Sequence, residues 1–171
     1  MELSGFPEFV ALRYADLLRT AYLLTGTREA AEDLVQSALL STMRRWSTIV
    51  EPMAYVRRAM VNYRTSLWRR MGSRELLTPA PPDRVVPDGA AGQAERDELL
   101  AALSRLPVRM RTVLVLRYWE DLSEVETARI LGCSVGSVKS QASRGLTRLR
   151  EVLRPRTEPR LGEAAWVGGV E

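Results

Sequence analysis

The sequence contains no histidine and only one cysteine, Cys133. The lack of histidine excludes Ser-His-Asp triads, imidazole general bases and zinc sites that need a histidine ligand. A single cysteine can form neither an internal disulfide nor a multi-thiolate metal site. We therefore expect no cofactor, no resident metal and no catalytic residue. The place of Cys133 in a turn between two predicted helices suggests a small buried apolar residue and not a reactive thiol, which would need exposure and a lowered pKa.

Aromatic residues and lysine are also scarce. Phe, Trp and Tyr make up 6% of the 171 residues, and Lys139 is the sole lysine among 25 basic residues. Abundant alanine, leucine and arginine favour helices over sheets. Arginine carries nearly all of the positive charge, and its forked guanidinium matches phosphate groups. The chain lacks a basic leader and a hydrophobic run long enough to span a bilayer, which predicts a cytoplasmic location without membrane insertion.

The last third of the chain has the pattern of a helix-turn-helix. Ser123 and Glu126 form a capping box, which predicts the start of a helix. Ala128 and Gly132 are small residues that let a second helix cross closely, and glycine also tolerates the positive φ of a tight turn. Ser134 can then cap the second helix.

The second helix of this pair has an apolar face and a polar face. Its apolar residues recur every three or four positions, at Val138, Ala142, Leu146, Leu149 and Leu153. The polar residues are Ser137, Lys139, Ser140, Gln141, Arg144, Thr147 and Arg148. The absence of a carboxylate before Glu151 suits a surface that meets phosphates and base edges. We predict a recognition helix for the DNA major groove; an amphipathic hairpin with a solvated basic face is the weaker alternative.

Hydrophobic periodicity predicts five further helices, so the expected fold class is all-α. These helices are residues 6–24, 27–46, 52–70, 96–106 and 107–119. Gly26 should end the first helix by adopting a left-handed conformation, and Pro52 is well placed at the start of the third. The periodicity is lost between the third and fourth helices, where four prolines occur in TPAPPDRVVPDGAAGQ.

We therefore predict two small helical domains joined by a flexible linker. Their predicted bounds are residues 1–70 and 95–154, with a linker at 71–94 and a poorly ordered tail at 155–171. A coil of about 24 residues spans ~27 Å on average and at most ~80 Å. Because DNA rises ~34 Å per turn, the two domains could reach sites about two helical turns apart.

The third predicted helix combines arginines with aromatic rings and has no acidic residue between Pro52 and Arg74. Its charged residues and rings are Arg57, Arg58, Arg64, Arg69, Arg70 and Arg74, with Tyr55, Tyr63 and Trp68. Arginines can neutralise a nucleic-acid backbone while rings receive unstacked bases. We predict a single-strand-binding surface. The alternative is a helix whose rings belong to the core and whose arginines are merely solvated.

The second predicted helix carries the stretch AEDLVQ. Glu32 and Asp33 are adjacent, so they point in different directions and do not converge on one substrate atom, which argues against catalysis. Asp33 and Gln36 share a face. This face fits either a contact surface for a protein partner or a solvated helix start.

With these features in view, the chain resembles an extracytoplasmic-function (ECF) sigma factor of the sigma-70 family, of the short actinobacterial type. The similarity extends from Phe6 to Leu153. AEDLVQSAL resembles region 2.2, PMAYVRRAMVNYRTSLWRR resembles region 2.4, and the segment from LPVRMR to LTRLRE resembles region 4. The resemblance implies an initiation factor, not an enzyme, that binds core RNA polymerase through the β′ clamp and the β flap.

The resemblance also assigns roles to residues. Asp33, Gln36 and Met43 match the helix that docks on β′, while Ser37 stands where many relatives have an acid. The −10 element would be read, and a flipped base held, by Trp46, Tyr55, Arg57, Arg58, Asn62 and Arg64. The −35 element would be read by Ser137, Lys139, Ser140, Gln141, Arg144 and Arg148. Promoter DNA is thus an implied partner, and an anti-sigma factor is a further one that the family allows.

Two other functions remain as alternatives. A stand-alone helix-turn-helix regulator would bind duplex operators without polymerase, but it leaves the arginine-rich helix and the AEDLVQ helix without a role. In a helical adaptor of the anti-sigma type, the basic face would have no function. Such an adaptor should keep its full activity when Lys139, Gln141 and Arg144 become alanine.

Overall fold

The computed structural model describes residues 4–75 and 93–154, with side-chain surroundings for 4–66 and 95–154. The helices are α1 (Phe6–Thr25), α2 (Arg28–Met43), α3 (Pro52–Glu75), α4 (Gln93–Ser104), α5 (Val108–Leu114), α6 (Glu124–Leu131) and α7 (Val135–Leu153). A short 3₁₀ turn, η1 (Trp46–Thr48), follows α2, and a π-helical turn, η2 (Val115–Trp119), follows α5. These two stretches of chain hold no strand, and none of their helices could cross a membrane. The all-α prediction is confirmed.

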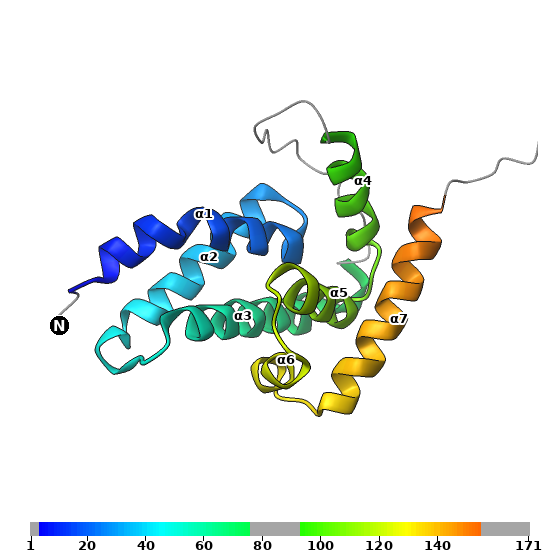
Figure 1. Cartoon of the computed structure of the whole chain (residues 1–171). Helices are drawn as coiled ribbons and strands as arrows, with labels where there is room; N and C mark the ends of the chain where they lie inside the picture. The colour runs from blue at the N-terminus through cyan, green and yellow to red at the C-terminus, as the bar shows by residue number, and fades with distance from the viewer. Residues whose placement is uncertain (1–3, 76–92, 155–171) are drawn as a thin grey trace, which may run out of the picture.

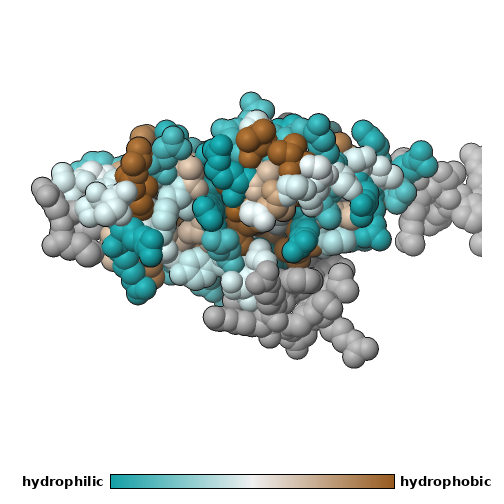
Figure 2. Space-filling view, turned by 90° about the horizontal axis from the view of Figure 1, so that it is seen from below, coloured by the Kyte–Doolittle hydropathy of each residue, from teal (hydrophilic) through white to brown (hydrophobic). Residues whose placement is uncertain are grey.

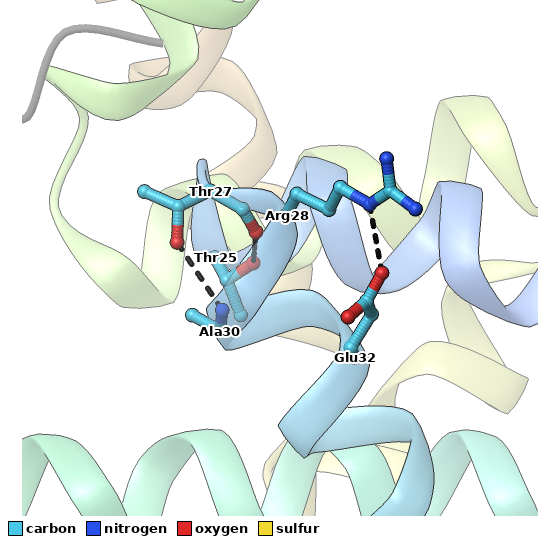
Figure 3. A network of polar contacts seen from close by, with 5 residues as sticks. All are labelled: Thr25, Thr27, Arg28, Ala30 and Glu32. Carbon is cyan, nitrogen blue, oxygen red and sulfur yellow. Dashed lines mark hydrogen bonds and ion pairs between the residues drawn. The ribbon is translucent and has the colours of Figure 1, made fainter. Parts of the chain in front are cut away.

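The turn between α1 and α2 forms as the sequence predicts. Gly26 has φ 93° and donates its backbone N–H to the carbonyl of Tyr22 at 2.8 Å, which ends α1. The Thr27 hydroxyl accepts from the backbone N–H of Ala30 at 3.3 Å and so caps α2 (Figure 3). Arg28 and Glu32, one turn apart, form an exposed ion pair at 2.8 Å.

The first three helices pack into one hydrophobic core (Figure 1). Helices α1 and α2 lie side by side, and α3 crosses beneath them. The buried residues of this core are Leu17, Ala21, Leu24, Ala31, Leu34, Val35, Ala38, Leu39, Val56, Ala59, Met60 and Val115. Most of them occupy the predicted apolar stripes, because residues three and four apart share one face of a helix.

The helix-turn-helix also forms as predicted. The Ser123 side chain accepts from the Glu126 backbone N–H, and the Glu126 carboxylate accepts from the Ser123 backbone N–H at 2.8 Å. These hydrogen bonds lower the pKa of Glu126. The Ser134 hydroxyl caps α7 by accepting from Ser137.

Two glycines in this region have different structural roles. Gly132 has φ 64°, but a Cβ placed on it would meet nothing within 4 Å, so its backbone conformation is what matters. The expectation that Gly132 gives space for close crossing is therefore wrong. Gly145 has that role, because a Cβ there would lie 3.2 Å from the side chain of Leu114.

Several helix ends differ from the sequence-based prediction. Helix α2 ends at Met43 instead of continuing to Trp46, and α3 continues beyond 70 to Glu75. Helix α4 begins at Gln93, so both α3 and α4 extend into the predicted linker. The reason is that no proline occurs between Pro52 and Pro79 or between Pro87 and Pro107, and lost amphipathicity alone does not break a helix. The rest of the linker and the tail at 155–171 lie outside the described residues.

The predicted helix 107–119 is divided into α5 and η2. In η2 the backbone N–H of Glu120 bonds to the carbonyl of Val115, five residues earlier, at 3.0 Å. Asp121 follows with φ 51°, so the chain turns sharply before α6. A π-helical turn has no clear sequence signature, because its residues are ordinary helix formers.

The two predicted domains pack against each other, which the sequence did not reveal. Val115 of η2 belongs to the hydrophobic core of α1, α2 and α3. Helix α6 lies against α3, and η2 lies against α1 (Figure 1). The chain is thus closed on itself.

Cys133 is exposed, and the expectation that it is buried is wrong. It lies just after the left-handed Gly132, and its backbone N–H bonds to the carbonyl of Ala128 at 3.1 Å. This helix-ending geometry directs the chain away from the apolar side of α6.

Candidate nucleic-acid interface

The exposed polar face of α3 carries two of the predicted DNA contacts. Arg58 and Asn62 lie four residues apart on one face of the helix, and both are exposed. Tyr55 is half-buried at the start of α3, with its hydroxyl 3.4 Å from that of Ser41. Exposed Tyr63 follows Asn62. The structure therefore brings together Tyr55, Arg58 and Asn62 near the first turns of α3.

A cleft of about 380 Å³ opens beside these residues. Its walls come from the loop after α2, from the start of α3 and from α6. Three arginines line it, namely Arg45, Arg58 and Arg129. Because α6 forms one wall, the cleft has this shape while the two blocks are packed together.

The face that contains this cleft is mostly hydrophilic. The loop after α2, helix α6 and the start of α7 lie along the lower side of Figure 1, and Figure 2 views the molecule from that side. Hydrophobic residues there form small groups separated by hydrophilic ones (Figure 2). Such a surface suits phosphate and base-edge contacts better than a second apolar core.

Arg57 lies on a different side of α3 from Arg58. Its Nη2 is 2.5 Å and its Nε 2.6 Å from Oε2 of Glu120, and its side chain is 22% exposed. The other carboxylate oxygen of Glu120 accepts a hydrogen bond from the hydroxyl of Thr20. Arg57 is therefore engaged within the protein in this closed form.

Arg64 does not lie on the predicted DNA surface. Its side chain is buried, with 7% of the residue exposed, and its Nε donates to the carbonyl of Leu24 at 3.1 Å. Burial lowers the pKa of Arg64. A buried arginine that bonds the end of α1 stabilises the fold, and Arg64 is not accessible to DNA in this closed form.

Arg111 of α5 is a second buried arginine, and sequence reasoning missed it. Its Nε donates to the carbonyl of Leu23 at 2.5 Å. Burial, followed by the nearby charge of Arg64, lowers the pKa of Arg111 to about 10. Both arginines thus bind the C-terminal end of α1, where the helix dipole is negative and no basic residue of α1 is present.

Trp46 supports the loop after α2. Its ring packs against Phe6 and Phe9, with ring centroids 5.1 and 5.2 Å apart. The indole Nε1 donates to the carbonyl of Ser4 at 2.8 Å. These contacts hold the loop against the start of α1. Trp46 therefore stabilises the loop that forms one wall of the cleft.

The polar face of α7 is exposed or half-exposed along its length. Lys139, Arg144 and Arg148 are exposed, while Ser137, Ser140 and Gln141 are half-buried. Arg144 donates to the hydroxyl of Ser140 at 2.7 Å. Lys139 lies 3.6 Å from Glu124 in a surface ion pair, which contributes little and leaves the ammonium available to a phosphate.

The predicted docking face of α2 is also accessible. Asp33 and Gln36 are exposed and Met43 is half-buried. Leu40, which the sequence reasoning missed, is 53% exposed on the same helix. An exposed leucine four residues after Gln36 gives this face an apolar centre, which is typical of protein contact surfaces.

An apolar groove of about 180 Å³ lies elsewhere, between α1, α4, η2 and α7. It is lined by Leu23, Leu99, Leu103, Leu114, Val115, Tyr118, Trp119, Leu146 and Leu149. Tyr118 and Trp119 are more than half exposed at its edge. No residue in this lining is charged, so the groove fits an apolar protein segment and not DNA.

Comparison with known sequences gives consistent matches over nearly the whole chain. A family model described as Sigma-70, region 4 matches residues 96–149. The RNA polymerase sigma-E factor of Streptomyces avermitilis is 42% identical over 158 residues, covering 91% of this chain and 88% of that protein. The ECF RNA polymerase sigma factor SigM of Mycobacterium tuberculosis is 32% identical over 156 residues, covering 87% and 77%.

A solved structure has a similar arrangement. The sigma factor RpoE of Bartonella quintana, determined in complex with the anti-sigma factor NepR, superposes with a TM-score of 0.72 at 25% identity. The match covers 88% of this chain and 98% of that one. The similarity includes both helical blocks.

Proposed function

The chain belongs to the ECF subfamily of sigma-70 RNA polymerase sigma factors. We propose that separate surfaces of the protein contact promoter DNA and core polymerase during transcription initiation. The protein binds core RNA polymerase and directs promoter recognition, DNA melting and initiation. Its contribution is binding energy and not bond chemistry. The cytoplasm, where polymerase acts, is the compartment that this function implies.

We assign the −10 element to the start of α3 and to the adjoining loop after α2. Arg58 and Asn62 present a positive and an amide group on one exposed face, and Tyr55 offers a ring in the cleft. Extruding a base costs a few kcal/mol of unstacking, which stacking of ~1 to 3 kcal/mol per base can offset. The single observation that carries this assignment is the exposed pair Arg58 and Asn62 on one face of α3, next to the ring of Tyr55.

We assign the −35 element to α7. Lys139, Arg144 and Arg148 point to solvent from one helix, and the capped N-terminus of α7 is the part of a recognition helix that enters the major groove. Ser137, Ser140 and Gln141 lie among them as hydrogen-bonding groups for base edges.

We assign polymerase docking to two surfaces. The α2 face with Asp33, Gln36 and Leu40 fits the β′ clamp, and the apolar groove beside Tyr118 fits the β flap. The B. quintana relative was determined with an anti-sigma factor, so a protein of that kind is a further partner that we propose for this chain.

The docking assignment is tested by Asp33→Ala with Gln36→Ala. Both side chains are exposed, so the fold should keep its stability while co-purification with core polymerase falls at least fivefold, the loss expected for about 1 kcal/mol of contact energy. Asp16→Ala with Arg19→Ala is the matched control, because it removes an exposed ion pair from α1. Undiminished co-purification of the α2 variant would refute the docking face.

A further inference from the structure

We propose that Glu120 holds the free protein closed by occupying Arg57, so that η2 and α6 stay packed against the first block that carries the −10-reading helix α3. Promoter single strand and Glu120 would then compete for one arginine. The inference rests on the proposed function of α3.

The contact between Glu120 and Arg57 has the geometry of a specific ion pair. Nε and Nη2 of Arg57 both reach Oε2 of Glu120, at 2.6 and 2.5 Å, while Oε1 accepts from Thr20. The Glu120 side chain is 10% exposed. Both carboxylate oxygens are therefore bonded by the first block of the chain, as the oxygens of a phosphate would be.

The backbone holds Glu120 in this position. The π-helical turn bonds the Glu120 N–H to the carbonyl of Val115, and Val115 is buried in the core of α1, α2 and α3. Arg111, four residues before Val115, bonds the carbonyl of Leu23 at the end of α1. Apolar packing and a buried hydrogen bond thus flank the ion pair and bring it to the same place each time the chain closes.

Closure also places α6 beside the α3 residues proposed to hold an extruded base. Arg129 and Ile130 of α6 line the same cleft as Tyr55 and Arg58 of α3. The ion pair and α6 therefore act on two sides of the same helix, one by occupying Arg57 and the other by packing beside Tyr55 and Arg58.

The closed form is too small to read both promoter elements at once. A packed body of about 130 residues has a radius of gyration of ~14 Å and spans roughly 40 Å. Two elements about two helical turns apart are separated by ~70 Å. The two blocks must separate on the promoter, and separation releases Arg57 from Glu120 at the moment when DNA becomes available to it.

The first test measures closure without DNA. Small-angle X-ray scattering of the full chain carrying Glu120→Gln should give a radius of gyration roughly 1.3 to 1.5 times that of the wild type, as expected when two packed bodies separate. Arg57→Glu combined with Glu120→Arg restores an ion pair with the charges exchanged and should return the radius to the wild-type value. Glu124→Gln, which removes only the exposed pair with Lys139, should leave it unchanged. A Glu120→Gln protein that is folded and as compact as the wild type would overturn the inference.

The second test measures access to DNA. The probe is a labelled oligonucleotide carrying the non-template −10 strand of a promoter mapped with this protein. Glu120→Gln should bind it about tenfold more tightly than the wild type, if fewer than one wild-type molecule in ten is open. An expanded variant without tighter binding would refute the blocking role of Glu120.

A further variant separates this failure from a failure of the proposed function. Arg58→Ala added to Glu120→Gln should weaken binding of the probe, because Arg58 remains exposed when the chain opens. If that addition has no effect, the −10 assignment of α3 fails, whatever the scattering shows. If it weakens binding while Glu120→Gln alone gives no gain, only the inference about Glu120 fails.

Discussion

The arginines at positions 57, 58 and 64 of α3 meet three different environments. Arg58 is exposed beside the cleft, Arg57 is paired with Glu120, and Arg64 is buried against the end of α1. Sequence composition predicted a basic helix correctly but could not rank its arginines. The helical period could have separated Arg57 and Arg64 from Arg58, since Arg57 and Arg64 are seven residues apart and share a side with buried Met60 and Val61.

This difference predicts that two alanine substitutions change the free energy of unfolding by very different amounts. Arg64→Ala removes a buried side chain and leaves the carbonyl of Leu24 without its donor, so the free energy of unfolding should fall by about 2 to 4 kcal/mol. Arg58→Ala should change it by less than about 0.5 kcal/mol, because the side chain is exposed. Urea denaturation of both variants measures this. Equal stability losses would contradict the burial of one arginine and the exposure of the other.

A second pair of substitutions tests the left-handed glycines that end α1 and α6. Gly132→Ala should cost about 1 to 2 kcal/mol of stability from its positive φ alone, since a Cβ there meets nothing. Gly26→Ala has the same backbone penalty, and its methyl group would also lie 3.3 Å from Nη2 of Arg111. We expect it to cost about 1 kcal/mol more, because Arg111 is held by its bond to Leu23. Denaturant midpoints that fall equally would show that the Arg111 side chain moves away from the added methyl group at no cost in stability.

At the scale of the helices, local signals predicted most of what formed. Caps at Thr27, Ser123 and Ser134 and left-handed glycines at 26 and 132 fix helix ends through the residues next to them, so the sequence reveals them. The π-helical turn at η2 was not predictable in this way. It is stabilised by packing against α1 and by the placement of Glu120, which are contacts with distant parts of the chain.

The recognition helix provides a prediction at this scale. Lys139→Ala with Arg144→Ala removes two exposed cations from α7, so initiation should fall and the salt dependence of promoter binding should become shallower by about 2 in log–log slope. Polymerase binding should not change. Arg109→Ala, an exposed arginine of α5, is the control. Filter binding at several salt concentrations gives the slope, and a slope equal to that of the wild type would exclude α7 from the phosphate contacts.

At the scale of the whole molecule, the sequence indicated two helical blocks but not their contact. A linker of this length permits many relative positions, so its composition does not determine whether the blocks meet. The contact depends on Val115 entering the first core and on Arg57, Arg111 and Glu120 finding partners across the boundary. Sequence periodicity does not identify such residues, because each makes its contact alone and not as part of a repeating apolar face.

The central claim is that this chain directs core RNA polymerase to promoters. Its most direct test is in vitro transcription of genomic DNA by sigma-free core polymerase, with and without the protein, followed by sequencing of transcript 5′ ends. The account predicts new start sites that share two upstream elements about two helical turns apart. Folded protein that co-purifies with core polymerase but yields no new start site would contradict it.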